Sequence, residues 1–150
     1  MKFNKKLIIY IVIPIVVGFI GNLLGGSTDI YSKINTPPFA PPGFLFPIVW
    51  TILYILMGIS SYMVSKEKGS TEALTVYFIQ LGVNALWSLF FFRLNWFLFS
   101  ALWIVLLLCL VIYMIYLFSK LNKTAAYLQI PYSLWLAFAL VLNSSIYLLN

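Results

Sequence analysis

The side chains most able to carry chemistry in this chain are aromatic rings and carboxamides that recur at helical spacing. Trp50 and Tyr54 lie four residues apart, so a helix would place both on one face. A second stripe has offsets of 4, 7, 8 and 11 residues from its first member, and it comprises Gln80, Asn84, Trp87, Ser88 and Phe91. Aromatic rings give a binding site flat apolar walls, and carboxamides can orient a ligand through hydrogen bonds. The same carboxamides could instead join neighbouring helices.

A third stripe lies near the carboxyl end, and it comprises Tyr132, Trp135, Ala139, Leu142 and Asn143. The small Ala139 beside Trp135 leaves room either for a flat ligand or for a neighbouring helix. Two prolines, Pro14 and Pro131, fall within apolar stretches. Each should kink a helix by releasing the carbonyl group four residues earlier.

The composition excludes most conventional catalytic sites. The chain contains no histidine, one cysteine (Cys109) and three acidic residues. A Ser-His-Asp or Cys-His site and an internal disulfide are therefore excluded. A metal site is not expected because its usual ligands are missing, and no required cofactor is expected.

The elements that must position these stripes are transmembrane helices. Hydrophobic residues make up 63% of the 150 residues, charged residues make up 8%, and the mean hydropathy is +1.04. A soluble domain could not cover its surface with so few charges. At about 1.5 Å per residue, five apolar segments are long enough to cross a hydrocarbon core of about 30 Å. They are residues 7–24, 47–64, 74–92, 96–118 and 125–149. We expect an all-α membrane protein with one five-helix transmembrane domain over residues 1–150.

The nine basic residues predict how this domain lies in the membrane. Seven precede the first segment or lie in the second and fourth loops, whereas Lys33 and Arg93 lie in the first and third loops. The positive-inside rule then places the amino terminus in the cytoplasm, and the first loop and carboxyl terminus on the outer side. The basic excess is thus assigned to orientation and anionic lipid, and no nucleic-acid partner is expected. Arg93 could anchor a phosphate or cap carbonyl groups of the third segment.

The first loop, residues 25–46, is long enough to suggest a function. Residues 37–47 hold five of the seven prolines, so this part should be stiff and ordered. It could form a lid over a pocket or only a stiff connector. Asp29 and Lys33 are four residues apart and could pair on a short helical turn. Gly21 and Gly25 form a G-x-x-x-G pattern just before the loop, where we expect a frayed helix end rather than a dimer face.

Three motif blocks resemble the tryptophan-rich sensory protein and translocator protein family (TspO/MBR), also called the peripheral-type benzodiazepine receptor family. The first is P-x-F-x-P-P followed by V-W-T-x-L-Y-x-x-M-G, over residues 37–58. The second is the stripe from Gln80 to Phe91. The third is P-Y-x-x-W-x-x-F-A-x-x-x-N, from Pro131 to Asn143. The resemblance covers nearly the whole chain.

The resemblance implies five helices around a pocket beneath the first loop, in a homodimer of the bacterial cell membrane. It implies binding of tetrapyrroles such as protoporphyrin IX, and of isoquinoline carboxamide and benzodiazepine ligands. The implied ligand-binding residues are Pro42, Phe46, Trp50, Tyr54, Asn84, Trp87, Phe91, Tyr132, Trp135, Phe138, Ala139, Leu142 and Asn143. Vertebrate relatives also bind cholesterol. Here Tyr147 is followed by no basic residue, so the proposed cholesterol motif is incomplete.

Several functions remain open at this stage. The first is porphyrin binding, with Lys33 or Arg93 near the ligand's carboxylates. The second is light-dependent porphyrin breakdown, in which Trp50 and Trp135 would be redox partners, although no conventional catalytic constellation supports turnover. The alternatives are a passive transporter of porphyrins or small lipids and a ligand-responsive stress sensor. Ion-coupled transport is disfavoured, because no charged residue lies in the middle of the membrane and no internal repeat is present.

Overall fold

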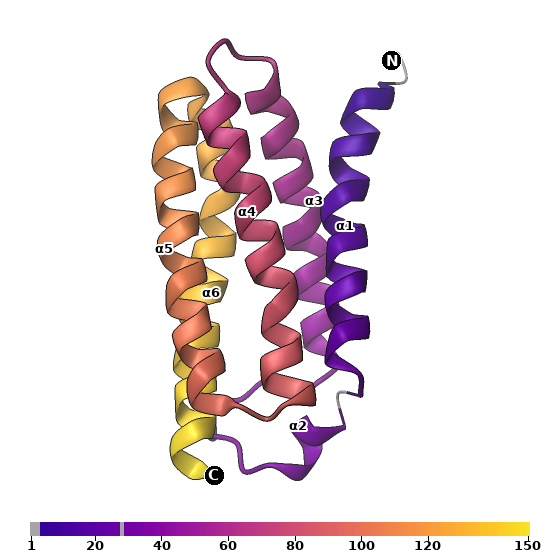
Figure 1. Cartoon of the computed structure of the whole chain (residues 1–150), viewed down its shortest axis with the longest axis vertical. Helices are drawn as coiled ribbons and strands as arrows, with labels where there is room; N and C mark the ends of the chain where they lie inside the picture. Colours follow the sequence, from indigo (N-terminus) through magenta and orange to yellow (C-terminus); the bar gives the residue numbers. More distant parts are fainter. Residues whose placement is uncertain (1–3, 28) are drawn as a thin grey trace.

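The computed structural model describes residues 4–27 and 29–150, and the helices and loops in these ranges contain no strand (Figure 1). Five of the helices are long and apolar enough to cross a membrane. They are α1 (Lys5–Gly25), α3 (Leu45–Ser65), α4 (Thr71–Ser88) with its π-helical extension η1 (Leu89–Arg93), α5 (Phe97–Leu121) and α6 (Lys123–Leu149). A short helix, α2 (Ile30–Lys33), lies in the first loop. The all-α fold with five spanning helices is therefore confirmed.

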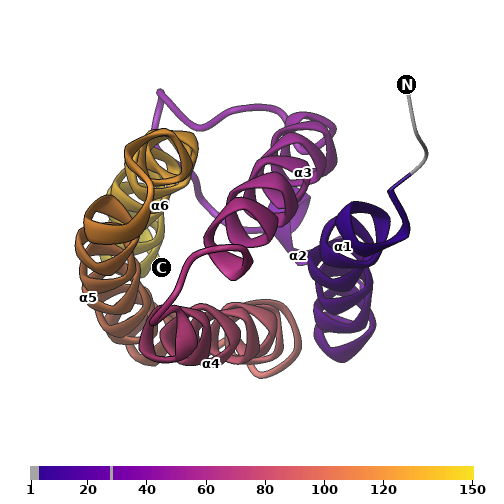
Figure 2. The ribbon, with the colours of Figure 1, turned by 90° about the horizontal axis from the view of Figure 1, so that it is seen from above.

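The spanning helices form a ring when viewed along the bundle (Figure 2). Helix α1 packs against α3 and α4, α4 packs against α5, α5 against α6, and α6 against α3. Helix α2 and the proline-rich segment run across the end of the bundle where α1 ends and α3 begins (Figure 1). We call this the loop end. The ring places the inward stripes of α3, α4 and α6 around a common axis.

The core fills the bundle with apolar side chains from four of the spanning helices. Met57, Tyr77, Val111 and Phe118 are fully buried in its largest cluster, and α5 contributes much of it. A smaller cluster at the loop end is centred on Phe91, together with Leu142 and Ile146. The outward faces of the helices carry exposed apolar residues, as a bilayer requires.

The G-x-x-x-G pattern of α1 serves packing within the chain. Gly21 and Gly25 are buried inside the helix and face α4. A Cβ atom at Gly21 would lie 3.1 Å from the Ala85 carbonyl oxygen, and one at Gly25 would lie 3.0 Å from the Ser88 Cβ. The expectation of a frayed end was therefore wrong, because close backbone contact with α4 orders this part of the helix. The helix ends at Gly26, which has a positive φ of 70°.

A second close contact joins α1 and α3 near the middle of the bundle. Pro14 lies inside α1 and removes the hydrogen-bond donor that the Tyr10 carbonyl would otherwise meet. A Cβ atom on Gly58 would lie 2.7 Å from that carbonyl oxygen and would also overlap Ile11. The absence of a side chain at Gly58 therefore lets α3 pack directly on the α1 backbone.

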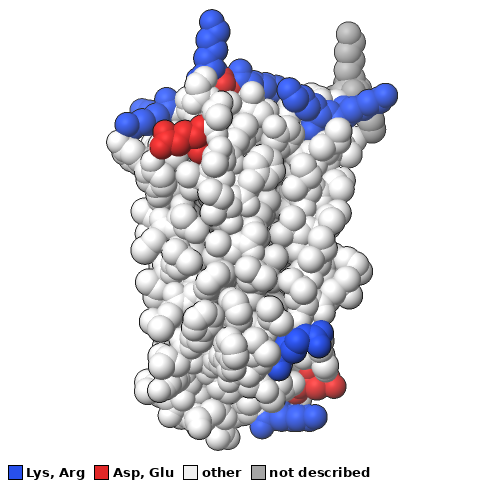
Figure 3. Space-filling model, in the orientation of Figure 1, with Lys and Arg blue, Asp and Glu red and all other residues white. Residues whose placement is uncertain are grey.

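Charged side chains lie at the two ends of the molecule, with an uncharged wall between them (Figure 3). Lys5 and Lys6 share one end with the α3–α4 and α5–α6 loops, whereas Lys33 and Arg93 lie at the loop end (Figure 1). Lys2, which we included in the orientation argument, lies outside the described residues. This separation is that of an integral membrane protein. The cytoplasmic placement of the amino terminus stays a prediction.

Candidate functional site

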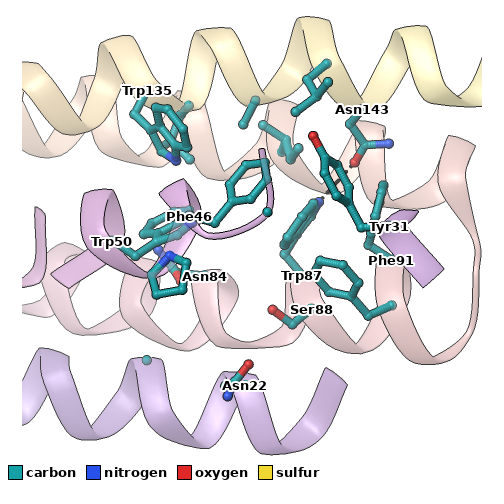
Figure 4. A pocket seen from close by; sticks show the side chains of 18 of the residues that line it. Asn22, Tyr31, Phe46, Trp50, Asn84, Trp87, Ser88, Phe91, Trp135 and Asn143 are labelled. Carbon is teal, nitrogen blue, oxygen red and sulfur yellow. Dashed lines mark hydrogen bonds between the residues drawn. The ribbon is translucent and has the colours of Figure 1, made fainter. Parts of the chain in front are cut away.

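A cavity of about 670 Å³ lies inside the ring at the loop end. All five spanning helices line it, together with α2 and the first loop (Figure 4). All but three of the residues expected to bind ligand line this cavity: Phe46, Trp50, Tyr54, Asn84, Trp87, Phe91, Trp135, Ala139, Leu142 and Asn143. The three stripes of the sequence therefore do converge on one space.

Three expected residues lie elsewhere. Pro42 is exposed in the first loop, where its carbonyl accepts a hydrogen bond from the Leu45 backbone at the start of α3. Tyr132 is 1% exposed and lies behind the cavity wall, and Phe138 packs against Trp135 from outside the cavity. These side chains support the wall without forming it.

The indole of Trp50 occupies the centre of the aromatic wall. It stacks on Tyr54 at a centroid distance of 5.5 Å and meets Trp135 edge-on at 6.5 Å with an interplanar angle of 90°. Phe46 in turn contacts Trp135 at 5.9 Å. Rings at right angles form a corner that offers one face and one edge to a flat apolar molecule.

A chain of hydrogen bonds fixes the polar part of the cavity floor. The Tyr54 hydroxyl donates to Asn84 Oδ1 at 3.1 Å, and Asn84 Nδ2 donates to the Tyr132 hydroxyl at 2.8 Å. Tyr132 then donates to Gln80 Oε1 at 2.7 Å. The chain joins α3, α4 and α6. Asn84 therefore acts both as a cavity residue and as a link between helices, the two roles that its sequence left open.

The Asn143 side chain positions the Trp87 indole. Its Oδ1 accepts hydrogen bonds from Trp87 Nε1 and from Ser100 Oγ, both at 3.0 Å. Its Nδ2 donates to the Phe97 carbonyl at 2.9 Å. These bonds hold the Trp87 indole against the cavity, where it stacks on Phe91 at 4.9 Å.

The first loop closes the loop end of the cavity and is tied to its surroundings. The Tyr31 hydroxyl donates to the Pro41 carbonyl at 2.6 Å, and the Tyr31 ring meets Phe46 edge-on at 5.2 Å. Partial burial raises the pKa of the Tyr31 phenol above its ordinary value. Asn35 and Asn150 bond reciprocally, with Asn150 Nδ2 donating to the Asn35 carbonyl at 2.9 Å. The segment therefore covers the cavity as well as connecting α1 to α3.

Arg93 has a structural role that differs from the one expected. Its Nε donates to the Leu24 carbonyl at 2.6 Å, and its Nη2 donates to the Leu23 carbonyl at 3.3 Å. It therefore caps the carboxyl end of α1 and not that of the third segment. Arg93 is the last residue of η1, and the π-helical turn of η1 places Phe91 and Phe92 at the cavity. Asp29 immediately precedes α2 and Lys33 is its last residue, and no ion pair joins them among the residues described.

Sequence reasoning missed the contribution of α1. Gly18, Asn22 and Phe19 line the cavity, and the Tyr54 ring packs where a Gly18 side chain would lie. Apart from Asn22 near its end, the spanning part of the helix is apolar on all sides, so no stripe marked its inner face. The regular spacing of Gly18, Gly21 and Gly25 was the available signal. Asp29 and Tyr31 of the first loop were also missed.

Comparison with known proteins agrees with this architecture. Residues 10–149 match the sequence profile of the TspO/MBR family. A tryptophan-rich protein TspO of Archaeoglobus fulgidus is 34% identical, over 97% of each chain. A tryptophan-rich sensory protein of Cereibacter sphaeroides is 36% identical over 80% of this chain and 76% of its own, and a translocator protein of Sus scrofa is 33% identical over 89% and 83%. The chain therefore belongs to the TspO/MBR family of integral membrane proteins.

Proposed function

We propose that the protein binds a tetrapyrrole such as protoporphyrin IX in the cavity beneath the first loop. The observation that carries this proposal is the corner formed by Trp50 and Trp135 in a cavity of about 670 Å³. That volume lies within the range of about 300–1,000 Å³ that small-molecule sites span. A porphyrin ring is flat and apolar, so stacking on indole and phenol faces would hold it.

The two ends of such a ligand differ in polarity, and this difference decides how it would lie in the cavity. The ring would lie toward Trp50 and Trp135, and the carboxylates would lie at the loop end near water. Lys33 is the exposed cation of α2 there, whereas two nitrogens of Arg93 are already bonded to carbonyl groups. We therefore assign Lys33 before Arg93 as the partner of the carboxylates.

Trp135 offers a hydrogen bond to the ligand. Its Nε1 is buried, and none of the residues in 4–27 and 29–150 accepts its hydrogen. A buried donor without a partner is costly, so a ligand oxygen or pyrrole nitrogen at this point would be favoured. The same donor suits the amide oxygen of isoquinoline carboxamide and benzodiazepine ligands, which we propose as synthetic occupants.

Light-dependent breakdown of the bound porphyrin is the chemical extension of this proposal. Dioxygen would be the oxidant, and one molecule would convert one methine C=C bond of the excited ring into two C=O bonds. No atom leaves in this step and no further reductant is consumed. Trp50 and Trp135 would donate an electron to the excited ring and accept it back as the product forms. Passive translocation and ligand sensing remain alternatives, which the names of the porcine and Cereibacter relatives favour.

A dark titration followed by illumination separates these functions. Purified protein is titrated with protoporphyrin IX while tryptophan fluorescence is followed, and porphyrin absorbance is then read under light. Trp50→Phe and Trp135→Phe are compared with Trp96→Phe, whose exposed indole lies outside the cavity. Protein-dependent loss of porphyrin that requires Trp50 and Trp135 supports breakdown. Loss equal to that of free porphyrin, with binding intact, supports a binder, carrier or sensor.

A further inference from the structure

We infer that the cavity takes up its ligand sideways from the bilayer, through an opening between the loop-end halves of α1 and α3. This inference rests on the proposed function, because it concerns the route by which an apolar ligand reaches that site. Phe19 and Asn22 of α1 and Pro47 and Thr51 of α3 flank this space, which we call the lateral opening. All four line the cavity and are also exposed on the outside of the bundle.

The residues of α3 that face α1 show where the contact between these two helices ends. Pro47, Thr51, Tyr54 and Gly58 are spaced by 4, 3 and 4 residues and therefore share one face. Gly58 packs on the α1 backbone, and Tyr54 packs on Gly18. Thr51 and Pro47 continue the same face toward the loop end but are exposed. The two helices therefore touch along one half and separate along the other.

The partner stripe of α1 behaves in the same way. Ile11, Ile15, Gly18 and Asn22 have the same spacing of 4, 3 and 4 residues. Ile11 and Gly18 meet α3, whereas Ile15 and Asn22 line the cavity and are exposed. The Asn22 carboxamide lies beside the cavity (Figure 4). Phe19, which is 62% exposed, forms the outer edge of the opening. Both edges lie within helices that span the membrane, so the opening faces hydrocarbon.

The route through the first loop is comparatively closed. Tyr31 ties α2 to Pro41, and Asn35 is joined to Asn150 at the end of α6. Arg93 secures the end of α1, so the lid is held on several sides. Opening the lid would break these bonds together. A ligand that enters through the lateral opening has only lipid to displace. A porphyrin dissolves in bilayers, so the sideways route matches the chemistry of the proposed ligand.

Association and dissociation rates of protoporphyrin IX, measured by stopped-flow quenching on the full chain in lipid nanodiscs, test this route. Thr51→Phe narrows the lateral opening, and its neighbour Ile52, which is 54% exposed and does not line the cavity, supplies the control Ile52→Phe. Phe19→Ala widens the opening, with Ile20→Ala as its control. We expect Thr51→Phe to slow both rates by about tenfold, since a gate changes rates more than affinity, and Phe19→Ala to raise both.

Fixing the first loop in place with a disulfide tests the alternative route, entry through the loop end. Asn35→Cys with Asn150→Cys, in a Cys109→Ser background, would join the lid to α6 by a disulfide where the two asparagines now bond. Lateral uptake predicts unchanged rates after oxidation. Slower rates in the locked protein, with Thr51→Phe and Phe19→Ala at wild-type rates, would overturn the inference while leaving the binding site intact. If Thr51→Phe changes only the oligomeric state, the opening is a subunit interface and the inference also fails. Absence of saturable binding to wild-type protein would instead refute the proposed function, and the route with it.

Discussion

At the scale of single residues, two buried glutamines show how the polar groups of the bundle differ. Gln80 accepts a hydrogen bond from Tyr132 through its oxygen and completes the chain that begins at Tyr54, although its Nε2 has no partner in the described part of the chain. Gln129 is equally buried, but neither its oxygen nor its nitrogen has a partner in the described part of the chain. An unpaired carboxamide inside a bundle costs free energy, whereas a paired one links helices.

Replacement of each glutamine by leucine should therefore have opposite effects. Gln80→Leu should lower the free energy of unfolding by about 1 kcal/mol, because it leaves the Tyr132 hydroxyl without its acceptor. Gln129→Leu should leave stability unchanged or raise it, because it removes an unpaired group of similar size. Thermal unfolding of both variants in the same detergent gives the comparison. A larger loss for Gln129→Leu than for Gln80→Leu would mean that the Gln129 carboxamide has a partner of its own.

At the scale of helices, close backbone contacts determine how α1 joins the ring. Gly58 meets α1 at the carbonyl that Pro14 releases, and Gly21 meets α4. Large side chains at these points would push the helices apart. Since the cavity lies beside these contacts, the position of α1 also determines the shape of the site.

Gly58→Ala should destabilise the protein by about 1–3 kcal/mol, because a Cβ atom there overlaps the α1 backbone. Gly82 provides a matched control, since a Cβ atom at this helical position would meet nothing within 4 Å. Gly82→Ala should be neutral or stabilising by up to about 1 kcal/mol, owing to the higher helix propensity of alanine. Equal melting temperatures for the two variants would contradict the packing described for α1 and α3.

The helices themselves could be predicted from sequence, but parts of the site could not. Runs of apolar residues revealed the five spans, and the stripes of α3, α4 and α6 revealed their inner faces because polar side chains in hydrocarbon must face protein. In the span of α1, Asn22 is an isolated carboxamide that forms no stripe with other polar residues, so Asn22 and Phe19 were missed. The π-helical register of η1 and the capping of α1 by Arg93 depend on tertiary contacts between segments far apart in sequence.

At the scale of the whole molecule, charge separation predicts the orientation in the membrane. In a Cys109→Ser background, Lys68→Cys and Lys33→Cys place single thiols at opposite ends of the bundle. We expect a membrane-impermeant maleimide added to intact cells to label Lys33→Cys, and Lys68→Cys only after lysis. Labelling of Lys68→Cys in intact cells would show that the protein has the opposite orientation in the membrane.

The central claim is that the cavity beneath the first loop binds a flat apolar ligand, and filling the cavity tests it most directly. Ala139 lines the cavity, whereas Ala137, two residues away on α6, is exposed and does not. Protoporphyrin IX is titrated in the dark against wild type, Ala139→Phe and Ala137→Phe, with quenching of tryptophan fluorescence as the signal. We predict saturable binding to wild type and Ala137→Phe, and a Kd at least about tenfold higher for Ala139→Phe, equivalent to about 1.4 kcal/mol. Equal affinity in all three proteins would place the porphyrin outside this cavity and contradict the account.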